Sequence, residues 1–270
     1  MAPRPERIQL AAERESAEKT AELAKFIERA AAAYRAEGIP VLPDGRINMT
    51  AFRDVEPDLQ KDEEKVREMK AMFEEQAEAE GLEKSATDGE KLEMLTHAVM
   101  HKSLSKKFIV ARSSYFDDIY NKTDTILFDR QTGDPICTFD EVGDTKGSLY
   151  EKKQAAVRDR NLGKGGITLK YGLKLEDAEG KKKMVPGAVQ HIPVFYIALP
   201  KDRIEKGVRE FEPSAERQSD FEKKLFEYFL QALAFQVQGL ELYNNRLDPN
   251  LKNRLAAFKK MLAEMQKIKT

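Results

Sequence analysis

The sequence lacks several features that mark large classes of protein. Its 270 residues include one cysteine, which excludes an intrachain disulfide framework and any zinc site built from cysteines alone. No run approaches the roughly 18 uninterrupted apolar residues of a membrane-spanning helix. The first residues lack the apolar stretch of a secretory signal peptide. We therefore expect a cytoplasmic protein without a membrane partner.

An excess of charge of either sign is also missing. The 46 Lys and Arg residues nearly balance the 47 Asp and Glu residues, which gives a formal net charge of −1. Contact with nucleic acid must therefore come from a local basic patch, because the whole molecule is not a polycation. Hydrophobic residues make up 41% of the chain, which is enough to build a sizeable core.

Composition and periodicity divide the chain into three segments. Residues 1–84 form a helical N-terminal extension, residues 85–213 an α/β core, and residues 214–270 a pair of helices that packs on the core or on a partner. The stretch from Arg53 to Glu93 has 15 acidic and 7 basic residues, a net charge of −8. It is either a solvated helix face or an acidic flap that covers a basic groove elsewhere in the chain.

The core segment alternates helical and β-type patterns. Capping boxes begin helices at Thr87 and Ser148, and another begins the C-terminal pair at Ser219. We expect these strands: Phe108–Ala111, Asp124–Asp129, Pro135–Val142, Ile167–Leu175 and Val189–Leu199. The order helix, strand, hairpin, helix, strand, strand predicts an α/β fold with a mixed sheet flanked by helices.

The hairpin centred on Thr132 brings two acids together. Its register pairs residues whose numbers sum to about 264, so Phe128 faces Ile136 and Asp124 faces Asp140. Like charges directly across an antiparallel pair are destabilising, and a divalent cation such as Mg²⁺ or Mn²⁺ would resolve their repulsion. Alternation turns the side chain of Glu141 to the other face, so only its backbone carbonyl would assist the metal. The alternative is that these are solvated acids at strand ends without a ligand.

Two runs in this segment, Arg112 to Leu127 and Ile136 to Val142, resemble the PD-(D/E)XK nuclease superfamily. The resemblance implies a restriction-endonuclease-like core with Asp124 and Asp140 as metal ligands. The superfamily's lysine has no match here, because positions 142 and 143 are Val and Gly. Lys152 and Lys153, in the first turn of the following helix, are the candidates to replace it. Glu93 on the first core helix would be the supporting acid.

The stretch after the hairpin is basic. Residues 146–183 contain 11 basic and 5 acidic residues, a net charge of +6. We expect four of its residues to contact DNA or RNA, with the aromatic ring stacked on a base: Lys164, Lys170, Tyr171 and Lys174.

Together these features predict a metal-dependent nuclease-like protein that hydrolyses phosphodiester bonds. The alternative on the same fold is a catalytically inactive binding or scaffold protein. Its terminal helices would join a protein partner or a second copy. A third reading is a regulatory protein unrelated to nucleic acid.

Overall fold

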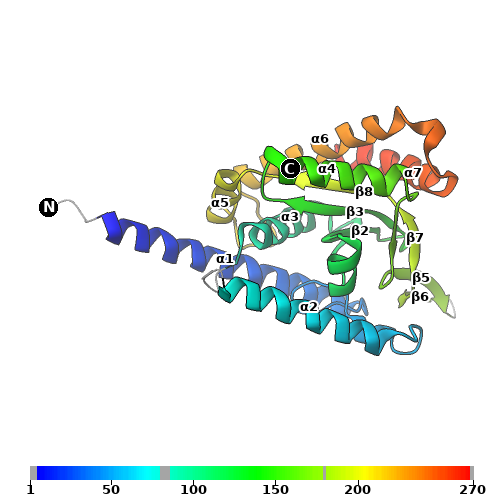
Figure 1. Cartoon of the computed structure of the whole chain (residues 1–270), viewed down its shortest axis with the longest axis horizontal. Coiled ribbons are helices and arrows are strands. Elements are labelled where there is room, and N and C mark those ends of the chain that lie inside the picture. The colour runs from blue at the N-terminus through cyan, green and yellow to red at the C-terminus, as the bar shows by residue number, and fades with distance from the viewer. Residues whose placement is uncertain (1–4, 80–85, 179–180, 268–270) are drawn as a thin grey trace.

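The computed structural model describes residues 5–79, 86–178 and 181–267 (Figure 1). The helices are α1 (Pro5–Ala36), α2 (Leu59–Ala79), α3 (Asp88–Leu104), α4 (Gly147–Leu162), α5 (Lys201–Arg209), α6 (Asp220–Glu241) and α7 (Pro249–Met265). The strands are β1 (Phe108–Arg112), β2 (Thr125–Asp129), β3 (Pro135–Val142), β4 (Ile167–Leu169), β5 (Leu173–Ala178), β6 (Lys181–Pro186), β7 (Val189–Ile192) and β8 (Val194–Ala198). In this described part of the chain, no helix combines the length and the apolar character needed to cross a membrane.

Four strands form a mixed sheet in the order β1-β2-β3-β8. β1 and β2 pair antiparallel, as do β2 and β3, and β8 runs parallel to β3. A parallel neighbour needs a long crossover connection, and here α4 and strands β4 to β7 provide it. The expected mixed sheet flanked by helices is confirmed.

The register of the β2–β3 hairpin agrees with the prediction near the acidic end. Ile126 lies opposite Thr138, as expected. Beyond Leu127 the prediction is wrong, because a β-bulge between Leu127 and Phe128 places Phe128 opposite Pro135. An extra residue on one strand shifts the pairing by one from the bulge onward. The shift lies on the turn side, so it leaves the end that carries the acids in the predicted register.

The two long strands expected after α4 are each interrupted. β4 pairs with β7, whereas β5 and β6 form a separate hairpin, in which β5 includes the end of the strand expected over 167–175 and β6 was not expected. His191 has a left-handed backbone conformation, with φ of 60°, and Pro193 separates β7 from β8. Proline cannot donate to a β ladder, so the apolar run breaks there and its two halves join different sheets.

Helix starts follow the sequence where a capping side chain is present. Thr87 and Ser219 both form complete capping boxes, at the starts of α3 and α6. The predicted box at Ser148 is wrong, because α4 begins at Gly147 after Lys146, which gives no side-chain cap. Helix α5 follows Pro200 and was not expected from the pattern.

The faces of the sheet contact two different apolar cores. Leu127, Phe139 and Ile197 belong to a core shared with α3, α6 and α7. Ile126, Phe128 and Val194 belong to a second core that includes Val157 of α4 and the loop segment near Phe52. The C-terminal helix pair therefore packs on the core, which was one of its two expected placements.

Candidate carboxylate site

Two carboxyl groups lie together at the open end of the β2–β3 hairpin. Asp124 precedes β2 and is 6% exposed, and Glu141 near the end of β3 is 7% exposed. The backbone N–H of Glu141 donates to Asp124 Oδ2 at 2.7 Å. Glu141 Oε1 accepts from the Thr125 hydroxyl at 3.0 Å. Among the described residues, Glu141 Oε2 is buried without a hydrogen-bond partner.

Burial raises the pKa of both groups. The pKa of Asp124 lies well above its ordinary value, first because of desolvation and then because of the neighbouring charge of Glu141. Desolvation likewise raises the pKa of Glu141, and the neighbouring Asp124 and Thr125 side chains oppose that rise. Two buried acids in contact cannot both be charged without a compensating partner. They either share a proton or bind a cation.

Glu93 of α3 contributes a third acid that is already paired. Arg112, at the end of β1, and Arg46, in the loop after α1, both bind its Oε2 atom. Arg46 also contacts Asp118 at 2.8 Å and lies 4.6 Å from the centre of the Tyr115 ring. The N-terminal segment therefore supplies a cation to this site, which its sequence position did not indicate.

Asp140 makes a different set of contacts. Its side chain is 2% exposed and meets Lys153 Nζ through Oδ1 and Arg160, at 2.8 Å, through Oδ2. Both cations lie on α4 and are seven residues apart, which places them on one face of the helix. Lys152 is exposed. Of the two lysine candidates, Lys153 is therefore the one that reaches a carboxylate of the hairpin.

These contacts revise the expected arrangement of the acids. The sequence predicts that Asp140 is the partner of Asp124 and that Glu141 offers only its backbone. In the structure, Glu141 bonds Asp124 through its backbone N–H and Thr125 through its side chain, and two cations hold Asp140.

The fit to a metal ion rests on Asp124 and Glu141. Within residues 5–79, 86–178 and 181–267, no group of three or more His, Cys, Asp or Glu side chains is placed to hold a metal. Mg²⁺ characteristically uses one or two carboxylates and completes its shell with water and substrate phosphate. The pair of acids and the unsatisfied oxygen of Glu141 fit that mode of binding.

The serine-and-acid stretch before β2 has a structural role. Asp117 is fully buried and accepts hydrogen bonds from the Ser114 hydroxyl, the Asn121 amide and the backbone N–H groups of Lys170 and Tyr171. Burial raises its pKa, and these donors oppose the rise. Asp117 thus joins the loop before β2 to the turn between β4 and β5.

The expected nucleic-acid contacts do not form one exposed surface. Lys164 and Lys174 are exposed. Lys170 instead pairs with Asp62 of α2 and with Glu56, and the buried Tyr171 donates to Asp62 at 3.0 Å. The Tyr171 ring packs edge-on against Phe52 and Phe116, so it offers no face to a base. The acidic segment covers this part of the basic stretch, as one of its two interpretations suggested.

Sequence reasoning missed the cations of the site. Arg46 follows a turn of Pro43, Asp44 and Gly45, and nothing in that pattern marks it as close to β1. Arg160 was visible only as a member of the basic stretch. Its seven-residue spacing from Lys153 was a usable signal, because i and i+7 positions share a helix face.

Two cavities of about 360 and 380 Å³ lie along α4, and neither is lined by Asp124, Asp140 or Glu141. Comparison with known proteins adds no relative: no protein-family model, curated protein or solved structure matches the chain.

Proposed function

We propose that the protein is a metal-dependent nuclease-like enzyme that hydrolyses phosphodiester bonds of DNA or RNA. The observation that carries the proposal is the buried pair Asp124 and Glu141, with one carboxylate oxygen left without a hydrogen bond. An uncompensated pair of this kind needs a cation or a proton.

The order of elements supports the proposal. Helix α3, strands β1, β2 and β3, helix α4 and strand β8 follow one another with only the β4–β7 insertion between the last two. This is the helix–strand–strand–strand–helix–strand order of the PD-(D/E)XK superfamily that the sequence resembles. In this proposal the fold is restriction-endonuclease-like, and Glu93 on α3 is the supporting acid.

In the proposed reaction, Asp124 and Glu141 hold Mg²⁺ or Mn²⁺. The bound metal would polarise the phosphate and lower the pKa of a water molecule. Asp140 positions Lys153, whose amine offsets negative charge that develops on the phosphoryl oxygens. Arg46 and Arg112 pair with Glu93 beside the site. Lys164 and Lys174 remain available to contact the nucleic-acid backbone.

A second candidate, an inactive binding or scaffold protein on the same fold, is favoured by the balance of charge. The cluster contains six acids (Asp44, Glu93, Asp118, Asp124, Asp140 and Glu141) and five cations (Arg46, Lys70, Arg112, Lys153 and Arg160). One proton held between Asp124 and Glu141 would neutralise the cluster without a metal. This state would have no means of activating water.

The experiment compares the cleavage of labelled single- and double-stranded DNA and RNA in the presence of Mg²⁺, Mn²⁺ or EDTA. We expect Asp124→Asn and Glu141→Gln to lose about 100-fold or more of the cleavage rate. Asp144→Asn is the matched acid control, because Asp144 is exposed just beyond the same strand. Lys153→Met should also lose activity, whereas Lys152→Met should not.

Manganese binding, followed by electron paramagnetic resonance, separates the two candidates. Binding that both Asp124→Asn and Glu141→Gln abolish, together with cleavage, supports the enzyme. If the unaltered protein neither binds manganese nor cleaves nucleic acid, the inactive scaffold is supported. Cleavage that persists at full rate in both variants would refute the assignment of this site.

A further inference from the structure

A groove lies between α4 and the C-terminal part of α6, on the face of α4 that is turned away from Asp140. The two cavities described above share Ala155, Arg158, Leu162 and Tyr243, so they form one continuous groove. Residues 151, 155, 158 and 162 recur at helical spacing and form a single stripe on α4. Each cavity has the volume of a small-molecule site.

The groove combines an apolar floor with fixed polar groups. Leu162, Phe195 and Leu240 line it, and Phe235 stands 74% exposed at its rim. Gln236 holds the backbone of Tyr196 through two hydrogen bonds, of 2.8 and 3.0 Å. The amide of Gln154 donates to the Tyr196 hydroxyl at 2.7 Å. The wall formed by β8 is therefore held in place before any ligand binds.

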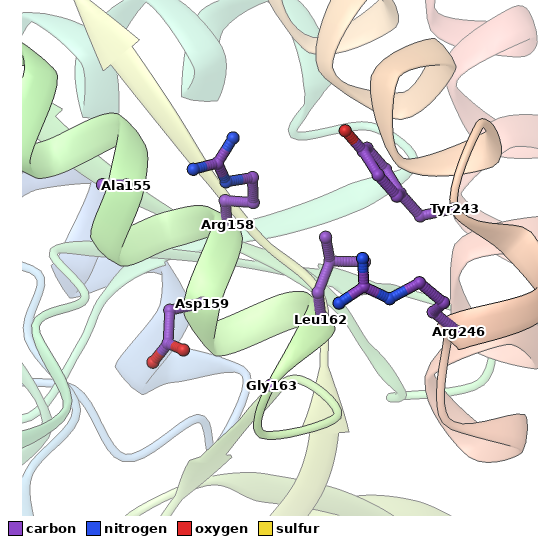
Figure 2. Close-up of a pocket in the computed structure, with 7 residues that line it drawn as sticks. All are labelled: Ala155, Arg158, Asp159, Leu162, Gly163, Tyr243 and Arg246. Carbon is purple, nitrogen blue, oxygen red and sulfur yellow. The ribbon is translucent and has the colours of Figure 1, made fainter.

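Two arginines line the groove without acid partners. In the part of the chain that the structure describes, neither Arg158 nor Arg246 forms an ion pair, and the Arg246 guanidinium lies 5.8 Å from the centre of the Tyr243 ring. Figure 2 shows the Arg158 side chain and the Tyr243 hydroxyl across the same gap, with Arg246 reaching toward Leu162. Asp159 also lines the cavity, but its carboxylate points away from both guanidinium groups (Figure 2).

Gly239 keeps the groove open. It lies inside helix α6, where glycine makes a helix less stable than alanine does. A Cβ atom at this position would meet nothing within 4 Å. A larger side chain therefore fits without a clash and would occupy part of the groove.

We infer that this groove binds a small organic anion, in which a carboxylate or phosphate group lies between Arg158 and Arg246 and an apolar body covers the floor. A guanidinium group donates two parallel hydrogen bonds to either type of anion, and an apolar body buries against Leu162 and Leu240. The inference goes beyond the proposed nuclease function, because none of its residues belongs to the carboxylate site.

Isothermal titration calorimetry with defined probes tests the inference. The anionic probes are octanoate and octyl phosphate, which distinguish a carboxylate head from a phosphate head. The controls are octan-1-ol, which lacks the charge, and acetate and inorganic phosphate, which lack the apolar body. We expect at least one octyl anion to bind about tenfold or more tightly than every control, since both halves of the ligand contribute.

Matched variants locate the binding. Arg158→Gln and Arg246→Gln should each weaken binding of the octyl anion about tenfold. Arg67→Gln, which removes an exposed arginine on α2, should leave it unchanged within about twofold. Gly239→Leu should abolish binding while it preserves the melting temperature, and Gly239→Ala should retain binding.

Three outcomes would overturn the inference. The octyl anions could bind no more tightly than their controls, or Arg158→Gln and Gly239→Leu could bind like the unaltered protein. In the third outcome, no anion binds and sedimentation shows self-association that Gly239→Leu abolishes, which would assign the groove to a second copy of the chain.

Discussion

Helix α4 presents two faces whose cationic side chains differ in what they contact. On one face, Lys153 and Arg160 both bind the buried carboxylate of Asp140. On the other, Arg158 lines a groove and meets no acid among the described residues. Sequence composition treats all three as members of one basic stretch. The contacts separate charges that already serve the fold from a charge that is available to a ligand.

The difference affects how each residue contributes to stability. Removing a cation that is paired with a buried acid leaves the charge of that acid uncompensated, and the resulting loss of stability is large. An exposed cation without a partner contributes little, so its replacement is nearly neutral. Three measurements test this contrast.

The largest effect is expected where such a pair is buried most completely. The side chains of Lys102 of α3 and Glu222 of α6 are both 0% exposed, and Lys102 Nζ lies 2.6 Å from Glu222 Oε1. Burial lowers the pKa of Lys102, and Glu222 opposes that change. Lys102→Met would leave the carboxylate of Glu222 buried without its cation, and we expect a loss of about 3–5 kcal/mol in the free energy of unfolding.

Urea denaturation followed by far-ultraviolet circular dichroism measures this loss, because the chain has no tryptophan to report by fluorescence. The double variant Lys102→Met/Glu222→Gln should recover part of the stability, because no unpaired charge remains. A loss below about 1 kcal/mol for Lys102→Met would show that the pair is not the buried one described here.

An intermediate effect is expected for bases that are buried without any acid. Burial lowers the pKa of His97 well below its ordinary value, and it lowers that of His101 to about 4. In the unfolded chain both groups titrate near 6.5. At the histidines, the unfolded state therefore binds more protons between about pH 6.5 and 4, so their contribution to stability falls as the pH falls through that window. The raised pKa values of Asp124 and Glu141 act in the opposite direction.

We expect His101 alone to account for a loss of about 2 kcal/mol between pH 7 and pH 5, measured by urea denaturation of the unaltered protein and of His101→Gln at each pH. His101→Gln keeps an acceptor for the Tyr34 hydroxyl, which lies 3.0 Å from His101 Nδ1. That variant should show a smaller pH dependence. An equal or steeper dependence would mean that other groups titrate in this window.

The smallest effect compares the two faces of α4 directly. Arg160→Gln removes one of two partners of Asp140 and should cost about 1 kcal/mol, because Lys153 remains to pair with the acid. Arg158→Gln should change the free energy of unfolding by no more than about 0.5 kcal/mol. Equal losses from the two variants would remove the distinction between the faces.

Much of the fold follows from local patterns. Capping boxes located the starts of α3 and α6 because a side chain that satisfies orphan N–H groups acts within one helical turn. The hairpin register was predictable beside the acids because a short turn joins the paired strands. The bulge at Phe128 was not predictable, since nothing nearby marks an extra residue.

The candidate site was predictable in part, and the reason lies in the distance of its contacts along the chain. Asp124 lies across the hairpin from Asp140 and Glu141, so the proximity of their backbones could be inferred. Arg46 reaches Glu93 and Asp118 from the loop after α1, and Lys170 reaches Asp62 of α2. Such contacts depend on how separate elements pack, which periodicity within one element does not record.

The parallel pairing of β3 with β8 has a consequence for synthesis of the protein. Every residue of β3 is buried in the finished molecule, yet one of its edges must wait for Val194 to leave the ribosome. Until then, the nascent chain carries an apolar strand with an open edge, and such edges recruit other chains. A product that terminates between Val142 and Val194 should therefore precipitate or be degraded, even though most of the sheet has already been made.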